Sequence, residues 1–239
     1  FFLENPELII EIFHISHFKN LEIHPETLRL LSDCSKLIRK KQINSKISNK
    51  LFLEFFSSET NPRPILRLMN DTNVLGNFIP DFKKIIGLIQ HDMYHHYTVD
   101  EHTFFAISNA HELKNKSLNS GTELASKLIF EIDRFELLTV SLFLHDIAKG
   151  LQGDHSINGF KIAKSLCPRL GLNNDETEIV SWCVLNHLYL SETAFRYDLN
   201  DKKIVEKSTK KINTIEKLNL LFVLTVCDIK AVGPGVWTD

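Results

Sequence analysis

The hydrophobic positions along this chain predict helices throughout. Residues 122–132 and 134–148 are amphipathic or almost wholly apolar over helical lengths, and residues 174–188 and 213–230 have the same character. Runs that alternate between polar and apolar residues, as a half-buried strand does, are short. The pattern therefore predicts an all-α fold.

Capping residues, prolines and glycines mark where these helices begin and end. Asn5 followed by Pro6 has the order of a helix cap and a first-turn proline. Pro25 and Pro62 are expected to open further helices, and Asn70-Asp71 with Gly76 and Pro80 is expected to break the chain again. The N-terminal part of the chain is thus expected to contain several helices.

His145 and Asp146 stand side by side at the end of an apolar stretch. Burying an imidazole and a carboxylate is costly unless each has a partner, and a divalent metal ion satisfies both together. The turn from Gly150 to Gly153 follows, and Asp154 is expected to cap a helix that runs through Ala163. Two neighbouring ligands cannot hold a metal alone, so others must come from elsewhere in the chain.

Two candidates lie on apolar stretches to either side. Thr98 and Glu101 have the spacing of a capping box, which would place His102 in the first turns of a helix and on its apolar face. Asp228 closes a strongly apolar segment and needs a counter-ion or a metal. Taken singly, His102 could be a hydrogen-bonded core residue, and Asp228 could cap a helix or pair with Lys230.

Together these residues form a mixed nitrogen and oxygen ligand set. His102, His145, Asp146 and Asp228 are therefore predicted to bind a divalent metal ion, with manganese or magnesium preferred to iron or zinc. The adjacency of His145 and Asp146 makes the ligand interpretation stronger for the set than for any one member.

Composition agrees with a compact intracellular domain. Of the 239 residues, 43% are hydrophobic, and the net charge of −2 gives no reason to expect nucleic acid as a partner. The four cysteines are scattered, which suits a reducing compartment, and no apolar run is long enough to span a bilayer. We therefore expect a cytoplasmic protein without a membrane segment. The missing initiator methionine suggests a piece of a longer protein.

Four motifs carry more specific information. They are residues 94–103 (YHHYTVDEHT), 144–150 (LHDIAKG), 153–156 (GDHS) and 228–237 (DIKAVGPGVW). In this order they resemble the HD superfamily of metal-dependent phosphohydrolases, and in detail the HD domain of the bacterial bifunctional uridylyltransferase/uridylyl-removing enzymes. The N-terminal stretch, notably residues 5–7 and 74–80 (VLGNFIP), resembles the helical segment between the transferase and HD domains of that family.

The resemblance implies an all-α HD domain at residues 91–239, preceded by a helical linker at residues 1–90. It implies that the chain hydrolyses the uridylyl group from a tyrosine of the uridylylated PII nitrogen-signalling protein, using water activated by one or two metal ions. The chain lacks the Gly-Ser motif with paired aspartates of a nucleotidyltransferase, and it has no room for the family's regulatory ACT domains. We therefore expect no uridylyl transfer and a lost or altered response to glutamine.

The resemblance also implies a second site. In HD domains with two metals, histidines at the places of His155 and His187 bind the second ion, and the aspartate corresponding to Asp146 bridges both. His155 and His187 could instead be ordinary helix-end residues. The family's His-His pair is replaced here by Asn186 and His187, and an amide is a weak, neutral ligand. Asp146 and Lys149 are the expected catalytic residues, although Lys149 could also be a solvent-exposed lysine at a helix end.

The other histidines and the basic stretches have simpler interpretations. We assign His95 and His96 to the rim of the pocket or to structure, because loops hold ligands less firmly than helices do. Residues 36–50 and 202–211 are interpreted as solvated helix faces, with docking of an acidic partner as the weaker alternative. The histidines interpreted as ordinary residues are His14, His17, His24, His91 and His111.

Two other functions remain open from the sequence. The first is a different HD phosphohydrolase that acts on nucleotides or cyclic dinucleotides. The second is a non-catalytic HD module that binds nucleotide or docks PII, and Asn186 is the feature that favours it.

Overall fold

The fold consists of helices joined by turns and loops. The computed structural model describes the chain apart from residues 1, 91–95, 116–120, 234 and 238–239, and no strand occurs in the part that it describes. The all-α prediction is therefore confirmed. Within the described residues, no helix is both long enough and apolar enough to cross a membrane.

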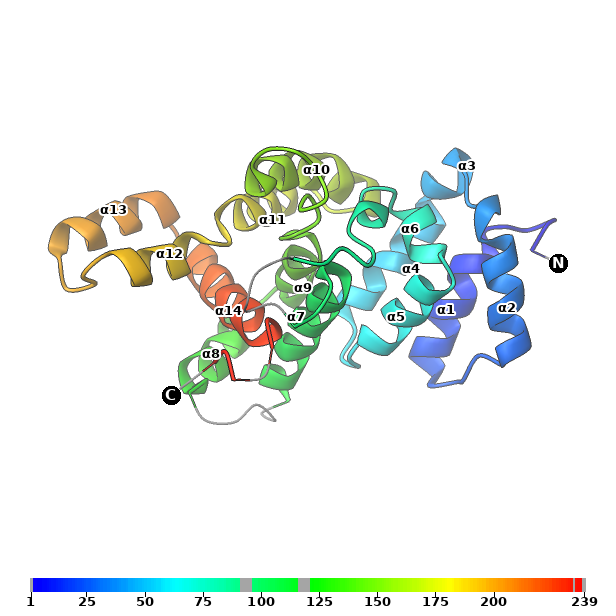
Figure 1. Ribbon diagram of the computed structural model, residues 1–239, viewed down its shortest axis with the longest axis horizontal. Helices are drawn as coiled ribbons and strands as arrows, with labels where there is room; N and C mark the ends of the chain where they lie inside the picture. The colour runs from blue at the N-terminus through cyan, green and yellow to red at the C-terminus, as the bar shows by residue number, and fades with distance from the viewer. Residues whose placement is uncertain (1, 91–95, 116–120, 234, 238–239) are drawn as a thin grey trace.

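The N-terminal part of the molecule is a group of short helices. They are α1 (Leu8–Lys19), α2 (Pro25–Cys34), α3 (Lys40–Ile43), α4 (Lys46–Ser57), α5 (Arg63–Asp71) and α6 (Val74–Phe78), with 3-10 turns at Ser35–Leu37 and Phe82–Lys84. As Figure 1 shows, this group lies together at one end of an elongated molecule. As predicted, Pro25 opens a helix, and Pro62 immediately precedes another.

The remaining helices form the part of the molecule that carries the predicted site residues. They are α7 (Val99–Lys114), α8 (Glu123–Leu128), α9 (Phe135–Leu144), α10 (His155–Leu170), α11 (Asn174–Asn186), α12 (Tyr189–Arg196), α13 (Lys202–Ile212) and α14 (Ile215–Ala231), with a 3-10 turn at Ile129–Glu131. Helix α10 packs against α11, and α14 packs against α7. Helix α9 contacts α7, α11 and α14, while α12 and α13 project at the end farthest from α1 (Figure 1).

Polar caps explain several helix starts. Asp154 accepts hydrogen bonds from the backbone N–H groups of Ser156 and Ile157, so it caps α10 as predicted. Asn173 and Glu176 form a capping box at the start of α11. These caps satisfy backbone N–H groups in the first turn, which have no partner within the helix.

Some local predictions are wrong. Helix α7 begins after Thr98, but the Thr98 side chain makes no capping hydrogen bond. The other half of the predicted capping box is also absent, because the Glu101 carboxylate forms ion pairs with Arg67 (3.1 Å) and Arg63 (3.9 Å) of α5. The predicted break is present, since α5 ends at Asp71 and α6 ends at Phe78, before Pro80. Gly76 itself, however, lies inside α6, where a Cβ atom would come within 2.9 Å of the Ile86 side chain.

Two helices also have an end that differs from the predicted one. Helix α1 begins at Leu8 rather than at Asn5-Pro6, because the Leu8 N–H donates to the Asn5 carbonyl and closes a turn before the helix. Helix α10 continues past Ala163 to Leu170 and ends at Gly171, whose φ of 111° is one that glycine adopts without steric cost.

An aromatic cluster joins the N-terminal helices to α9. Phe52 and Phe56 of α4 pack against Phe143 of α9, with ring centroids 5.9 and 5.2 Å apart. Phe82 stacks on the other side between Phe143 (4.9 Å) and Phe104 of α7 (5.7 Å). All five rings are fully buried, so α9 is fixed between both parts of the molecule. The residues that follow α9 are thereby held at the centre of the fold.

Candidate metal centre

Six predicted site residues come from helix ends that are far apart in the sequence. His102 lies in the first turn of α7, and Asp228 lies in the last turn of α14. The four others stand at the ends of α9, α10 and α11: His145, Asp146, His155 and His187. The packing of these helices brings all six side chains together.

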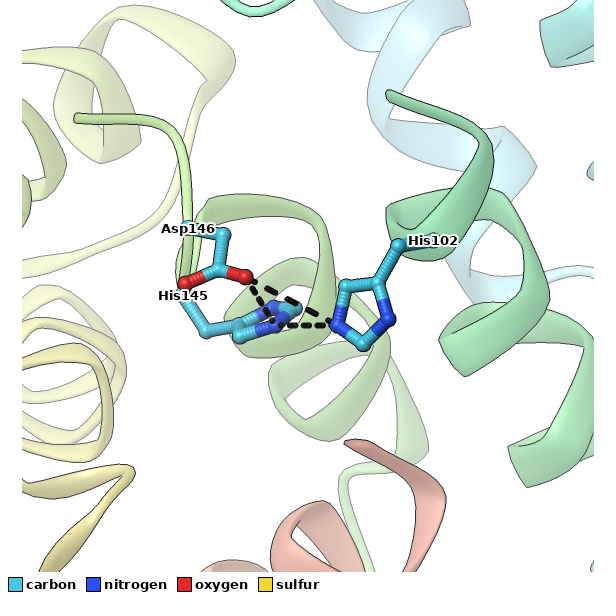
Figure 2. A group of neighbouring side chains, drawn as sticks. All are labelled: His102, His145 and Asp146. Carbon is cyan, nitrogen blue, oxygen red and sulfur yellow. Dashed lines mark hydrogen bonds and ion pairs between the residues drawn. The ribbon is translucent and has the colours of Figure 1, made fainter. Parts of the chain in front are cut away.

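The first group contains the four residues predicted to bind the first metal. The Nε2 atoms of His102 and His145 are 3.2 Å apart, and Asp146 Oδ2 lies 3.6 and 3.2 Å from them (Figure 2). Asp228 Oδ1 lies 2.9 Å from His102 Nε2 and 3.5 Å from His145 Nε2. Imidazole nitrogens and carboxylate oxygens of the four residues thus face one small space.

The second group shares Asp146. Its Oδ1 lies 3.8 Å from His155 Nε2 and 3.7 Å from His187 Nε2, and these two nitrogens are 3.3 Å apart. Asp146 Oδ1 is buried and accepts no hydrogen bond from the described residues. A buried carboxylate oxygen without a donor is costly, which is the condition that a cation would relieve.

Backbone carbonyls orient two of the rings. His145 Nδ1 lies 2.6 Å from the Leu142 carbonyl oxygen, and His187 Nδ1 lies 2.7 Å from that of Val184. Because a carbonyl can only accept, Nδ1 carries the proton in each ring and donates it. Each Nε2 therefore points toward Asp146, as a metal-binding imidazole requires. The sequence analysis missed these carbonyls, although a histidine directly after a helix end always follows unpaired carbonyls of the last turn.

In the first group, two ionised carboxyl groups lie beside a protonated His145. Burial alone would raise the pKa of Asp146 and Asp228, but the neighbouring His145 holds the pKa of both carboxyl groups well below the usual range. Burial alone would lower the pKa of His145, and the two carboxylates raise this pKa to about 10. Two ionised carboxylates in so buried a space require positive charge beside them.

In the second group, burial has a larger effect on the histidine pKa values than the charge of Asp146 has. It lowers the pKa of His187 to about 4 and lowers the pKa of His155 as well, with Asp146 opposing the shift in both. Both rings are therefore neutral at pH 7. Neutral imidazole is the form that binds metals.

Lys149 and Asn186 complete the surroundings of Asp146. Lys149 Nζ lies 2.7 Å from Asp146 Oδ2, and its side chain is 20% exposed, so it is an ion-paired residue rather than a freely solvated lysine. Asn186 donates from Nδ2 to the Trp182 carbonyl (2.8 Å). Its amide nitrogen thus donates a hydrogen bond within its own helix, α11.

The other histidines lie outside this cluster where they are described. The backbone N–H of His96 donates to the Val232 carbonyl, and its ring lies so close to Gly233 that a Cβ atom there would be 2.2 Å away. The assignment of His96 to structure fits these contacts, while His91 and His95 fall outside the described residues.

The residues present fit a divalent ion. Each group supplies imidazole nitrogens together with a carboxylate oxygen of Asp146, within 4.8 Å of one another, and could hold a metal. The donor set combines carboxylate oxygens, which suit magnesium and manganese, with imidazole nitrogens, which suit iron and zinc. The assignment of each residue as a ligand stays a prediction.

Two known families match different parts of the chain. The family described as the uridylyltransferase GlnD third domain matches residues 1–78, and the HD domain family matches residues 99–229. The second match covers more than half of the chain and contains all six predicted ligands. The predicted boundary between residues 90 and 91 falls between the two matches and stays a prediction.

Similar proteins extend the match to the whole chain. A bifunctional uridylyltransferase/uridylyl-removing enzyme of Zymomonas mobilis is 45% identical over 239 residues, and one of Novosphingobium aromaticivorans is 42% identical over 238 residues. The chain spans 26% of the length of each. It therefore belongs to the HD domain family and is similar, over its whole length, to one segment of the bifunctional uridylyltransferase/uridylyl-removing enzymes.

Proposed function

We propose that this HD domain hydrolyses the uridylyl group from the modified tyrosine of the PII signalling protein. The observation that carries the proposal is the position of Asp146, whose two oxygens face two different groups of histidines. A carboxylate shared in this way suits a pair of metal ions acting on a phosphodiester. The reaction itself is suggested by the uridylyl-removing activity in the names of the similar proteins.

The chemistry is divided between metal and protein. A bound divalent ion, manganese or magnesium in preference to iron or zinc, lowers the pKa of a water molecule and offsets phosphoryl charge. The protein keeps the rings of His145 and His187 oriented through their Nδ1 hydrogen bonds. Lys149 adds a positive charge beside Asp146 and is proposed to neutralise a phosphoryl oxygen.

The bond changes follow from the substrate. The oxygen of water forms a new bond to phosphorus, and the bond from phosphorus to the tyrosine oxygen breaks. The products are UMP and a free tyrosine side chain. Since a tyrosine hydroxyl has an ordinary pKa of about 10, its phenolate leaves without strong help from a general acid.

The test is release of UMP from uridylylated PII in the presence of manganese. We expect wild type to release UMP and Asp146→Ala to fall to the background rate, because this change removes a carboxylate shared by both groups. Asp146→Asn, which keeps the volume and removes the charge, should be nearly as inactive. Asp175→Asn, at an exposed carboxylate of α11, is the matched control and should keep full activity.

The outcomes separate this proposal from its alternatives. Equal cleavage by wild type and Asp146→Asn would contradict the mechanism. A wild-type protein that binds uridylylated PII but releases no UMP would favour a docking module. Release of phosphate from nucleotides, without action on PII, would favour another phosphohydrolase.

A further inference from the structure

A cavity of about 350 Å³ opens beside the second group of histidines. It lies between the start of α10, the end of α11 and α12, and His155 and Asn186 form part of its lining. Because His155 lines this cavity and its Nε2 is 3.8 Å from Asp146 Oδ1, the cavity adjoins the second group of histidines. Its volume falls within the range of small-molecule sites, about 300–1,000 Å³.

The lining combines exposed apolar side chains with polar groups. Ile157 of α10 and Leu185 of α11 are 47% and 36% exposed, and both face this cavity. Glu192 and Lys211 add a carboxylate and an ammonium group. Apolar surfaces for the faces of a ring, with polar groups for its edges, are the arrangement by which proteins hold a nucleobase.

One wall of the cavity is held in place by contacts between helices. The Tyr189 hydroxyl of α12 is within hydrogen-bond distance (3.0 Å) of the Ser208 hydroxyl of α13. The Lys211 ammonium lies over the Tyr189 ring, 4.1 Å from its centroid. Helix α13 therefore supports α12 at the edge of the cavity, and this wall exists before any ligand binds.

Asn186, which lines the cavity, keeps one amide atom as an acceptor. Its Nδ2 donates to the Trp182 carbonyl, which can only accept, so Oδ1 is the amide atom left for another partner. Within the described residues no hydrogen bond to Oδ1 is formed. The imide N–H of a uracil ring is a donor of the kind that this oxygen would accept.

We propose that this cavity binds the pyrimidine ribonucleoside of the substrate, with the base between Ile157 and Leu185 and the Glu192 carboxylate near the ribose hydroxyl groups. This inference rests on the proposed function, because it names the part of the substrate bound beside the reacting phosphodiester. A larger cavity, of about 560 Å³ between α12, α13 and α14, is lined mostly by apolar side chains and contains none of the six predicted ligands.

The test compares ligands that share a phosphate but differ in the base. With manganese present, UMP and ribose 5-phosphate are titrated into the protein by calorimetry. In the double variant Ile157→Ala/Leu185→Ala, we expect UMP to bind about tenfold more weakly, because the apolar contact with the base is lost. Binding of ribose 5-phosphate should be unchanged. The matched control is Ile47→Ala/Leu124→Ala, which removes two exposed apolar side chains on α4 and α8, outside the cavity.

Kinetics provide an independent readout. The 4-nitrophenyl ester of UMP and bis(4-nitrophenyl) phosphate have the same aryl leaving group, but only the first contains a nucleoside. We expect the double variant to raise KM for the UMP ester about tenfold with little change in kcat, and to hydrolyse the nucleoside-free diester like wild type.

Two failures are distinguishable. The nucleoside site is overturned if the double variant binds UMP as tightly as wild type, or if wild type binds UMP no better than ribose 5-phosphate. In either case, metal-dependent hydrolysis of either ester would still support the proposed function. If wild type hydrolyses neither ester nor uridylylated PII, the proposed function fails. Selective loss of UMP binding in the double variant would then still support the nucleoside site.

Discussion

At the scale of single residues, Asp146 is shared by the two groups of histidines. Its Oδ2 faces His102 and His145, whereas its Oδ1 faces His155 and His187. The two groups are therefore separable by mutation: a change at His155 or His187 leaves the four residues of the first group in place. The second group can be tested without removing the first.

His155→Ala and His187→Ala are expected to lower the turnover of uridylylated PII by roughly tenfold or more, as loss of a metal-site residue commonly does. His155 is partly exposed, so its replacement should change the free energy of unfolding little, whereas His187 is buried and needs a parallel stability measurement. Turnover and urea unfolding are measured for both. His24→Ala, at an exposed histidine of the N-terminal helices, is the control for turnover alone, because His24 also caps α2 by accepting from the Glu26 N–H. Unchanged turnover in both variants would make these histidines bystanders.

Lys149 tests the role of positive charge beside the shared carboxylate. Lys149→Gln should lower kcat about tenfold, while Lys149→Arg should keep most of it, because only the first removes the charge. Steady-state kinetics with uridylylated PII measure both. Lys164→Gln removes a lysine from an ion pair with Glu178 elsewhere on α10 and should leave kcat unchanged. Equal rates for Lys149→Gln and wild type would exclude an electrostatic role.

At the scale of elements, the site depends on where helices begin and end. Helix α10 starts at His155 because Asp154 accepts two backbone hydrogen bonds in its first turn. Helices α9 and α11 end just before His145 and His187, whose rings bind carbonyls of their own last turns. Helix ends thus set both the position and the orientation of the rings.

Asp154→Ala should therefore affect stability and activity together. Loss of this cap is expected to lower the free energy of unfolding, and the freer start of α10 should lower turnover. Asp201→Ala removes the cap of α13, where Asp201 accepts from the Lys203 N–H, and should destabilise the protein similarly with little change in turnover. Urea unfolding and kinetics on both variants provide the comparison. An equal loss of turnover in the two would show that the effect is not local to α10.

The sequence was sufficient to predict the convergence of the first group. A histidine and an aspartate side by side on an apolar helix require a partner, and His102 and Asp228 were the candidates on apolar faces. The missing capping box at Thr98 could not be foreseen, because Glu101 pairs with Arg67 of a helix remote in sequence. The cavity could not be predicted from the sequence either, because the exposed residues that line it follow no hydrophobic periodicity.

At the scale of the whole molecule, His111 lies where α7 meets the N-terminal helices. Its ring packs edge-on against Phe135, with centroids 5.1 Å apart. Burial lowers the pKa of His111 to about 4; the nearby Glu59 backbone opposes this shift, and the charges of Lys114 and His17 add to it. The folded protein therefore keeps this ring neutral, while the unfolded chain protonates it below its ordinary pKa of 6.5.

This difference predicts a loss of stability in acid. Since the unfolded state binds the additional proton, the contribution of His111 to the unfolding free energy is fully present above pH 6.5 and is lost as pH falls toward 4, by roughly 2 kcal/mol at pH 5. Urea unfolding between pH 7 and pH 5 measures it. His111→Leu should reduce the pH dependence without abolishing it, because the buried His187 also has a lowered pKa and keeps its contribution. Phe135→Leu, which alters the same contact without removing a titratable group, should retain the full dependence. A slope that His111→Leu leaves unchanged would assign the acid sensitivity to other groups.

The aromatic cluster around Phe143 restricts how this protein could exchange parts with others during evolution. Recombination that replaced the segment up to residue 78 would replace Phe52 and Phe56 while keeping Phe143, so the rings on the two sides would no longer be matched in shape. Close-packed interiors tolerate such mismatches poorly. The segment matched by the GlnD third domain and the one matched by the HD domain should therefore be inherited together, with substitutions at these rings correlated between them.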